Sequence, residues 1–204
     1  SATGQQDIAI GDGTSTASAG CATAIGYEAY DSGGYGTAIG YKSAIYAGKV
    51  GSDDSVAIGN SATVGGSALA VSSQGGTAVG AHTSVTAANG TAVGYYAQVS
   101  AAGGIAIGGT SGGATQTSVS STSGIAIGTS SVVNSGAGNS IAIGTSSTIS
   151  SGASNGIAIG ASANDSAATS IALGNGATVS GSGDSYSIAM GDAAAASNEY
   201  VVAI

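Results

Sequence analysis

A four-residue motif, apolar-Ala-apolar-Gly, recurs along the whole of this 204-residue chain. Three of its copies are Ile8-Ala9-Ile10-Gly11, Val56-Ala57-Ile58-Gly59 and Ile141-Ala142-Ile143-Gly144. Neighbouring motif glycines such as Gly26 and Gly40 are 14 positions apart, and longer intervals contain insertions. A regular period of this size indicates one small unit stacked many times, so function is expected on a surface rather than in a pocket.

The number of coils follows from counting the motif. Twelve copies are complete. Leu69-Ala70-Val71-Ser72 resembles a degraded copy, and Val202-Ala203-Ile204 stops where the next glycine is due. We therefore expect a parallel β-solenoid of about fourteen short coils, all β, forming a single repeat domain over residues 1–204.

The alternation of side chains along a strand predicts which residues face inwards. In Ile141-Ala142-Ile143 the two isoleucines share one face and Ala142 points to the other. We expect the large residues to line a narrow core. The central position is alanine in every complete copy, which predicts close packing against a neighbouring subunit. The predicted subunit-packing alanines are Ala9, Ala57, Ala106, Ala126, Ala142, Ala158, Ala172 and Ala189.

A weaker alternating pattern follows each glycine, as in Asn60-Ser61-Ala62-Thr63-Val64. It predicts a second short strand, and the Gly, Ser, Asn and Asp residues that come next predict a tight return turn. Ordering a coil of fourteen residues costs about 14–28 kcal/mol, whereas two or three buried Ile or Val side chains contribute about 3–9 kcal/mol. A lone coil is therefore unstable, and we expect stacked coils in an obligate homo-oligomer.

Two copies with their preceding residues, Asn139-Ser140-Ile141-Ala142-Ile143-Gly144 and Asp54-Ser55-Val56-Ala57-Ile58-Gly59, resemble the YadA-type head repeats of trimeric autotransporter adhesins. The resemblance implies a left-handed parallel β-roll, three of which associate side by side. It also implies a head that binds host matrix proteins such as collagen, or other cell surfaces. Similar repeats occur in bacteriophage tail fibres, so the implied location is extracellular, on a cell or virion surface.

The function expected from these patterns is a non-enzymatic, extracellular adhesive fibre, the trimeric head of an adhesin. The motif begins almost at the first residue and ends incomplete, which predicts either a fragment of a longer fibre or a subunit that stacks end to end into a filament. A bacteriophage tail-fibre segment is the third alternative. Three insertions, residues 43–52, 61–75 and 110–123, are expected to project as loops and are candidate binding elements.

Charge and composition exclude several classes of partner. The net charge is -8 with only two Lys or Arg residues, Lys42 and Lys49, which argues against nucleic acid. No apolar run is long enough to span a bilayer, so we expect no membrane insertion by this segment. The expected partner is a further copy of the chain, together with a host surface protein or glycan.

No catalytic, metal or cofactor site is predicted. His82 is the single histidine and no nucleophile motif accompanies it, so an exposed residue without a role is expected. The ten carboxylates show no pair at a recurring coil position, as a glycosidase would require. Residues 33–38 resemble a calcium-binding repeat, but Ala38 stands where that repeat has a ligating Asp.

Tyrosine is the one aromatic residue used, and it occurs nine times. Tyr27 and Tyr41 each follow a motif glycine one coil apart, which predicts rings about 4.8 Å apart on one ridge. An aromatic ladder and a patch that contacts glycan or protein both fit this pattern, and Tyr95 repeats the placement. The candidate surface-contact residues are Tyr27, Tyr30, Tyr35, Tyr41 and Tyr46.

Overall fold

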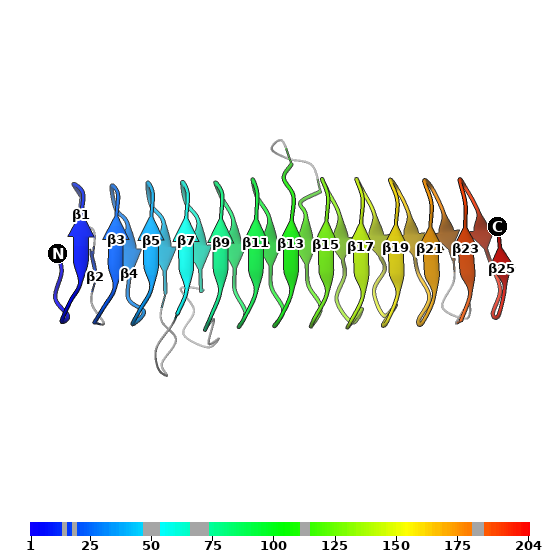
Figure 1. The fold of residues 1–204 in the computed structure, drawn as a ribbon, viewed down its shortest axis with the longest axis horizontal. Helices are drawn as coiled ribbons and strands as arrows, with labels where there is room; N and C mark the ends of the chain where they lie inside the picture. Colours follow the sequence, from blue (N-terminus) through cyan, green and yellow to red (C-terminus); the bar gives the residue numbers. More distant parts are fainter. Residues whose placement is uncertain (14–15, 18–19, 47–53, 66–73, 111–114, 181–185) are drawn as a thin grey trace. The chain divides into compact units, whose positions relative to one another are not determined.

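The protein folds entirely from β-strands and turns in the part of the chain that the computed structural model describes, which is residues 1–13, 16–17, 20–46, 54–65, 74–110, 115–180 and 186–204. Within this part no residue is helical. The chain divides into two compact units, Ser1–Gly103 and Gly104–Ile204, each built from the same repeated coil. Figure 1 shows the coils of each unit as successive rungs.

Unit 1 contains two parallel sheets, one of three-residue strands and one of two-residue strands. The strands of its long-strand sheet are β1 (Ile8–Ile10), β3 (Thr23–Ile25), β5 (Thr37–Ile39), β7 (Val56–Ile58), β9 (Thr77–Val79) and β11 (Thr91–Val93). Those of its short-strand sheet are β2 (Thr16–Ala17), β4 (Tyr30–Asp31), β6 (Ala44–Ile45), β8 (Thr63–Val64), β10 (Ser84–Val85) and β12 (Gln98–Val99).

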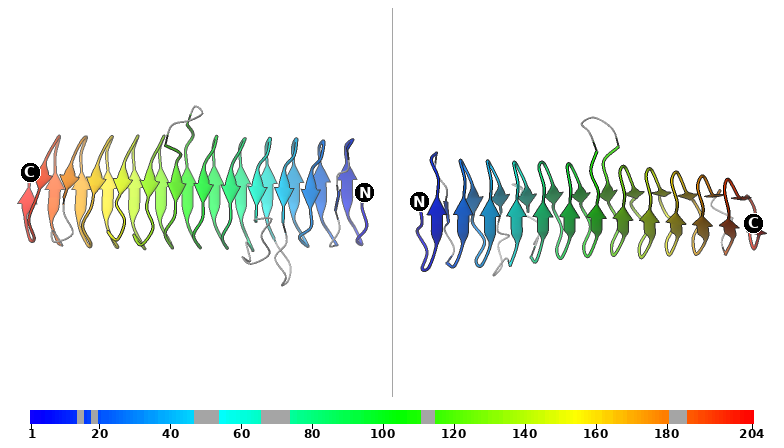
Figure 2. Two further views of the ribbon diagram at one scale, coloured as in Figure 1. Left: turned by 180° about the vertical axis from the view of Figure 1, so that it is seen from behind. Right: turned by 45° about the horizontal axis from the view of Figure 1, so that its top comes forward.

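Unit 2 repeats this arrangement, and Figure 2 shows the two rows of strands in each unit. Its long-strand sheet contains β13 (Ile105–Ile107), β15 (Ile125–Ile127), β17 (Ile141–Ile143), β19 (Ile157–Ile159), β21 (Ile171–Leu173), β23 (Ile188–Met190) and β25 (Val202–Ala203). Its short-strand sheet contains β14 (Ser118–Val119), β16 (Val132–Val133), β18 (Thr148–Ile149), β20 (Asn164–Asp165), β22 (Thr178–Val179) and β24 (Ala195–Ala196).

Each coil stacks on the next in strict register. In unit 1, Ala24 pairs with Ala38, and in unit 2, Ala142 pairs with Ala158. The same motif position therefore forms a continuous column along each sheet, which is why one residue type recurs there. The predicted parallel β-solenoid is confirmed, and so are the second short strand and, where the return turn is described, its polar character.

The turn between a long strand and the following short strand, here called the first corner, explains the motif glycine. Gly144 has φ 135°, and Ser146 two residues later has φ 57°. A Cβ atom on Gly144 would overlap the backbone carbonyl of Gly160 in the next coil. The corner therefore requires glycine for both its backbone conformation and its close stacking.

The predicted facing of the motif residues is wrong. The central alanines are buried inside a single chain, and the flanking Ile, Val and Thr residues point outwards, half-buried or exposed. Of the predicted subunit-packing alanines, seven have no exposed surface, and Ala9 in β1 is half-buried. The seven are Ala57, Ala106, Ala126, Ala142, Ala158, Ala172 and Ala189.

The width of the coil explains this reversal. A strand of three residues directs only its central side chain inwards, and that side chain faces the inner residue of a two-residue strand across a thin interior. The inner residue of the short strand is an aliphatic such as Val64, Val133 or Ile149, fully buried. Two inward isoleucines would overfill this space. The central position is therefore always alanine because it packs against the short strand of its own coil, not because it packs against another subunit.

The predicted count of about fourteen coils is not confirmed, because the described residues supply six long strands in unit 1 and seven in unit 2. The degraded motif at Leu69–Ser72 lies outside these residues, and β7 pairs directly with β9. The predicted insertions are shorter than expected, since β6 and β8 continue the regular coil into the first two, and β14 belongs to the regular coil at the end of the third. Their remaining parts, 47–52, 66–73 and 111–114, lie outside the described residues.

Candidate interaction surfaces

The outer face of the long-strand sheet in unit 2 carries two columns of large apolar side chains. All are half-buried or exposed, and Met190 is 43% exposed. The first column contains Ile105, Ile125, Ile141, Ile157, Ile171 and Ile188, and the second contains Ile107, Ile127, Ile143, Ile159, Leu173 and Met190. An aligned apolar surface of this kind typically marks an interaction site.

Unit 1 has the same two columns with a different composition. Its first outer column contains Thr23, Thr37, Val56, Thr77 and Thr91 after Ile8 of the first strand. Its second column remains aliphatic, with Ile10, Ile25, Ile39, Ile58, Val79 and Val93. These two columns in each unit, here called the outer columns, take the place of the alanines as the candidate subunit-packing surface.

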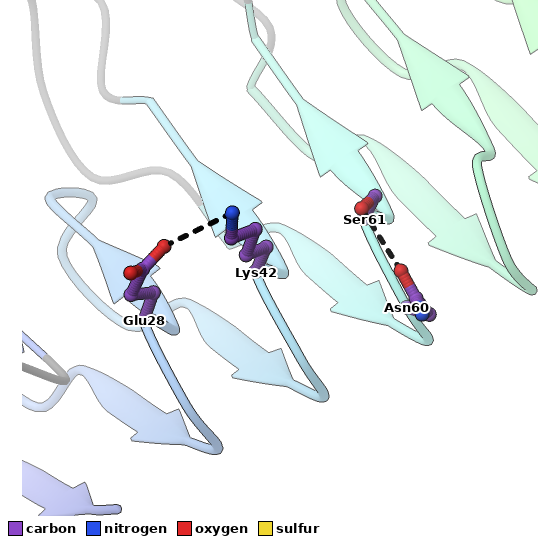
Figure 3. A network of polar contacts seen from close by, with 4 residues as sticks. All are labelled: Glu28, Lys42, Asn60 and Ser61. Atoms are coloured by element: carbon purple, nitrogen blue, oxygen red, sulfur yellow. Dashed lines mark hydrogen bonds and ion pairs between the residues drawn. The ribbon is translucent and has the colours of Figure 1, made fainter. Parts of the chain in front are cut away.

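The first corner forms a second exposed surface, in which two further columns are fixed by backbone hydrogen bonds. The N–H group of the residue in the left-handed conformation donates to the carbonyl of the residue after glycine in the preceding coil. In unit 1 the pairs are Lys42 to Tyr27, Ser61 to Tyr41, His82 to Asn60 and Tyr96 to Ala81, with N···O distances of 2.8–3.0 Å. Figure 3 shows side chains of this corner in three neighbouring coils.

In the two neighbouring coils that contain β3 and β5, the first-corner residues Tyr27 and Tyr41 stack as predicted. Their ring centroids are 5.4 Å apart and the planes differ by 9°. Beside them, Lys42 Nζ lies 3.4 Å from Glu28 Oε2 and 5.3 Å from the Tyr41 ring centroid. Hydrogen bonding to Tyr41, and then to Glu28, raises the pKa of the Lys42 ammonium group. The only described Lys or Arg side chain is therefore already paired with a carboxylate.

Further along the same corner, three rings form a cluster that the sequence reasoning missed. His82 stacks on Tyr96 at 4.7 Å between ring centroids with planes 14° apart. Tyr95 meets Tyr96 edge to face at 4.6 Å. His82 was expected to be an exposed residue without a role, but it is half-buried within this cluster. His82 stands two residues after the motif glycine Gly80, as Tyr96 does after Gly94, and the stacking of coils brings these equivalent positions into contact.

The five candidate tyrosines do not form one patch. Tyr27 and Tyr41 lie at the first corner, whereas Tyr30 and Tyr46 pack together on the short-strand side, 5.4 Å apart. Tyr35 lies on the opposite turn, which leads from a short strand to the next long strand and is here called the second corner. A comparable stacked pair, Tyr186 and Tyr200 with centroids 5.6 Å apart, occupies the second corner of unit 2.

A buried carboxylate stands in the inner column of each short-strand sheet, at Asp31 in unit 1 and Asp165 in unit 2. Asp165 accepts hydrogen bonds from the Ser170 hydroxyl and from the N–H groups of Ala167 and Ile157. Burial raises the pKa of Asp165, and these three donors partly oppose the shift. The donors all belong to its own coil, so this carboxylate braces the second corner.

The family model described as the YadA head domain repeat matches residues 2–29, 72–97, 86–111 and 185–204. The resemblance predicted from the sequence is confirmed. One matching solved structure is the collagen-binding domain of the Yersinia adhesin YadA, with 26% identity and a TM-score of 0.47. The match covers 74% of this chain and 65% of that chain. No curated protein matches the sequence.

The matched repeats include both kinds of surface. Residues 2–29 contain Tyr27 and Glu28, and residues 72–97 contain His82, Tyr95 and Tyr96.

Among the described residues, no group of three or more His, Cys, Asp or Glu side chains is placed to hold a metal ion. Nor do they include a helix with the length and apolarity needed to cross a membrane.

Proposed function

We propose that this chain is a non-enzymatic adhesive head that associates as a homotrimer through its outer columns. The head attaches the cell or virion that carries it to a host or cell surface. The observation that supports it best is the pair of aligned Ile, Val, Leu and Met columns on the long-strand sheet. The matched head repeats support the adhesive role, since that family consists of adhesins. The proposed location is extracellular, on a cell or virion surface.

Self-association follows from the chemistry of the outer columns. Fully burying an isoleucine contributes about 1.5–3 kcal/mol, so a half-exposed one gains about 1 kcal/mol when a second copy covers it. In unit 2 this gain recurs in every coil on the same face. Residues such as Ile141 and Ile143 in one copy would meet the same columns in other copies. Three-fold association and left-handed winding come to the proposal from the resemblance to YadA-type heads.

Attachment is assigned to the exposed surfaces that the trimer leaves free. The first and second corners are the turns of each coil, and they present most of the exposed aromatic side chains, including Tyr27, Tyr35 and Tyr95. A rigid solenoid displays such residues at a constant spacing, which suits multivalent contact with an extended partner. Host matrix proteins, collagen among them, and other cell surfaces are the partners that the resemblance implies, and the exposed tyrosines add cell-surface glycans to the candidates.

The test combines oligomeric state with attachment. Wild-type protein and the variant Ile141→Asp with Ile143→Asp are compared by analytical ultracentrifugation and by binding of coated beads to cultured epithelial cells. Ser151→Asp, at an exposed turn position, is the matched control. We expect the wild type and the control to form trimers and to attach to the cells. We expect the variant to be monomeric and to attach less. A monomeric wild type, or long filaments in place of discrete trimers, would contradict the proposal.

A further inference from the structure

The bulky side chains at the first corner of unit 1 are not needed to form that corner. In unit 2 the left-handed position is occupied by Ser130, Ser146 and Ser162, with φ 55–59°. In unit 1 the same position has His82 at φ 56° and Tyr96 at φ 60°. Bulky residues rarely adopt this conformation, and small ones build the same turn here. Disfavoured residues that the turn does not require are compatible with a functional role. Because Tyr186 and Tyr200 at the second corner share this conformation, with φ 64° and 59°, the arrangement of the exposed rings must distinguish the first corner of unit 1.

The column next to it, formed by the residue after each glycine, contains an interruption. Tyr41 and Tyr95 are separated by two coils that carry Asn60 and Ala81 at this position. With about 4.8 Å between coils, the two tyrosines are about 14 Å apart. The side chains between them are short, and Tyr41 and Tyr95 are 47% and 43% exposed. Two exposed aromatic rings thus flank a low, polar stretch of backbone and amide.

We propose that this surface, Tyr41, Asn60, His82, Tyr95 and Tyr96, here called the aromatic corner, binds a neutral carbohydrate chain. The proposal rests on the adhesive function proposed above and names the class of ligand. Sugar rings present faces of weakly positive C–H bonds, which stack on the negative faces of tyrosine rings. The Asn60 amide, the His82 imidazole and the tyrosine hydroxyl groups supply donors and acceptors for sugar hydroxyl groups.

Charge and dimensions favour this ligand over other partners. The chain has a net charge of -8, and Lys42 beside the aromatic corner is paired with Glu28, so the described residues offer an anionic glycan or nucleic acid no free cation there. A stable protein partner needs about 800 Å² on each side with an apolar centre. The aromatic corner is only one or two side chains wide. A linear sugar chain lying along it matches that width.

The experiment compares the whole chain with a variant in which a first corner of unit 1 receives the sequence of a first corner of unit 2. Tyr95→Thr with Tyr96→Ser reproduces Thr145-Ser146 of unit 2 and so preserves the backbone of the turn. Its control is Tyr186→Ser with Tyr200→Ser, which removes a stacked pair at the second corner. Each protein is applied to an array of neutral hexose and N-acetylhexosamine oligosaccharides, their sialylated and sulfated forms, and a collagen-like triple-helical peptide. Affinities for bound probes are then measured by titration calorimetry.

We expect wild type and control to bind neutral oligosaccharides and the corner variant to bind them at least tenfold more weakly. The proposal is overturned by unchanged binding in the corner variant, by binding only to anionic glycans or peptide, or by no binding to any probe. Sedimentation and cell attachment of the same proteins separate this outcome from failure of the proposed function. If wild type is trimeric and adherent but the corner variant attaches equally well, only the carbohydrate proposal fails.

Discussion

Units 1 and 2 share one coil but differ in two sets of outward positions. Inside, both units use a central alanine that faces an aliphatic residue in most coils, as Ala78 with Val85 and Ala142 with Ile149 illustrate, and a buried aspartate in one coil of each unit. Outside, the first outer column is mostly threonine in unit 1 and entirely isoleucine from β13 to β23 in unit 2. The first corner carries most of its aromatic and charged side chains in unit 1, whereas in unit 2 it is small and polar except for Asp192.

This difference separates what the fold demands from what the surface is free to specify. The central alanines and the motif glycines are constant because the thin interior and the stacked corners accept little else. Outer columns and corners vary because several residues satisfy the same backbone. Unit 2 therefore presents the more apolar outer face, on which the proposed self-association depends, and unit 1 presents the more distinctive corner, on which the proposed recognition depends.

The largest effect is expected from a substitution in the buried alanine column that both units share. Ala142→Arg places a charge in a fully buried column, and we expect it to lower the free energy of unfolding by about 4 kcal/mol or more. Ala78→Arg should do the same in unit 1. Ile141→Arg, one residue away and outward, should leave each chain folded while weakening association. Circular dichroism and sedimentation distinguish these results, and a folded Ala142→Arg protein would contradict the inner assignment.

A smaller effect is expected when the outer columns are exchanged between the units. Replacing Ile125, Ile141 and Ile157 by Thr removes about 1 kcal/mol of buried apolar contact at each position, so we expect weaker association. Replacing Thr37, Thr77 and Thr91 by Ile should strengthen it. Dissociation of the oligomer on dilution measures both changes. Equal affinities in the two variants would show that the outer columns are not the interface.

The sequence was sufficient to predict the solenoid, its two strands per coil and the stacked tyrosines, because each depends on a period that is visible in one dimension. The inward and outward faces were assigned wrongly. Alternation reveals that Ile141 and Ala142 lie on opposite faces but not which face is inside. That choice depends on the width of the coil, set by the short strand opposite.

The aromatic corner illustrates a second limit of the sequence. His82 lies 14 positions before Tyr96, and no local pattern links them. Once coils stack in register, this interval becomes direct contact between rings. Aligning the sequence by the motif glycines would have revealed the pair. Exposure and the stacking angle are properties of the folded coil alone.

A pH-dependent effect is expected in unit 2 from Asp165. Because burial raises its pKa above the ordinary 3.8, the folded chain binds more protons than the unfolded chain between these two values. The contribution of Asp165 to stability is therefore greatest in acid, falls as the pH rises through this window, and is constant above it. Asp165→Asn removes the titration while keeping one acceptor. Denaturant unfolding at several pH values should show wild type losing stability relative to the variant as the pH rises. A difference that does not vary with pH would refute this account.

The smallest effect on stability is expected at the first corner, and its size differs between the units. In unit 1, Tyr96→Ser keeps a residue with a Cβ atom in the left-handed conformation, so that cost remains, but the variant loses the ring contacts with His82 and Tyr95. Such exposed contacts are worth about 0.5–1.5 kcal/mol, so the free energy of unfolding should fall by about 1 kcal/mol. In unit 2, Ser146→Tyr also keeps the left-handed conformation, and Ser130 and Ser162 offer no ring to stack on, so the free energy of unfolding should change by less than about 0.5 kcal/mol. Thermal unfolding of the two variants measures this asymmetry. A loss of several kcal/mol in Tyr96→Ser would mean that the rings hold the coil together, and their exposure would then need no ligand to explain it.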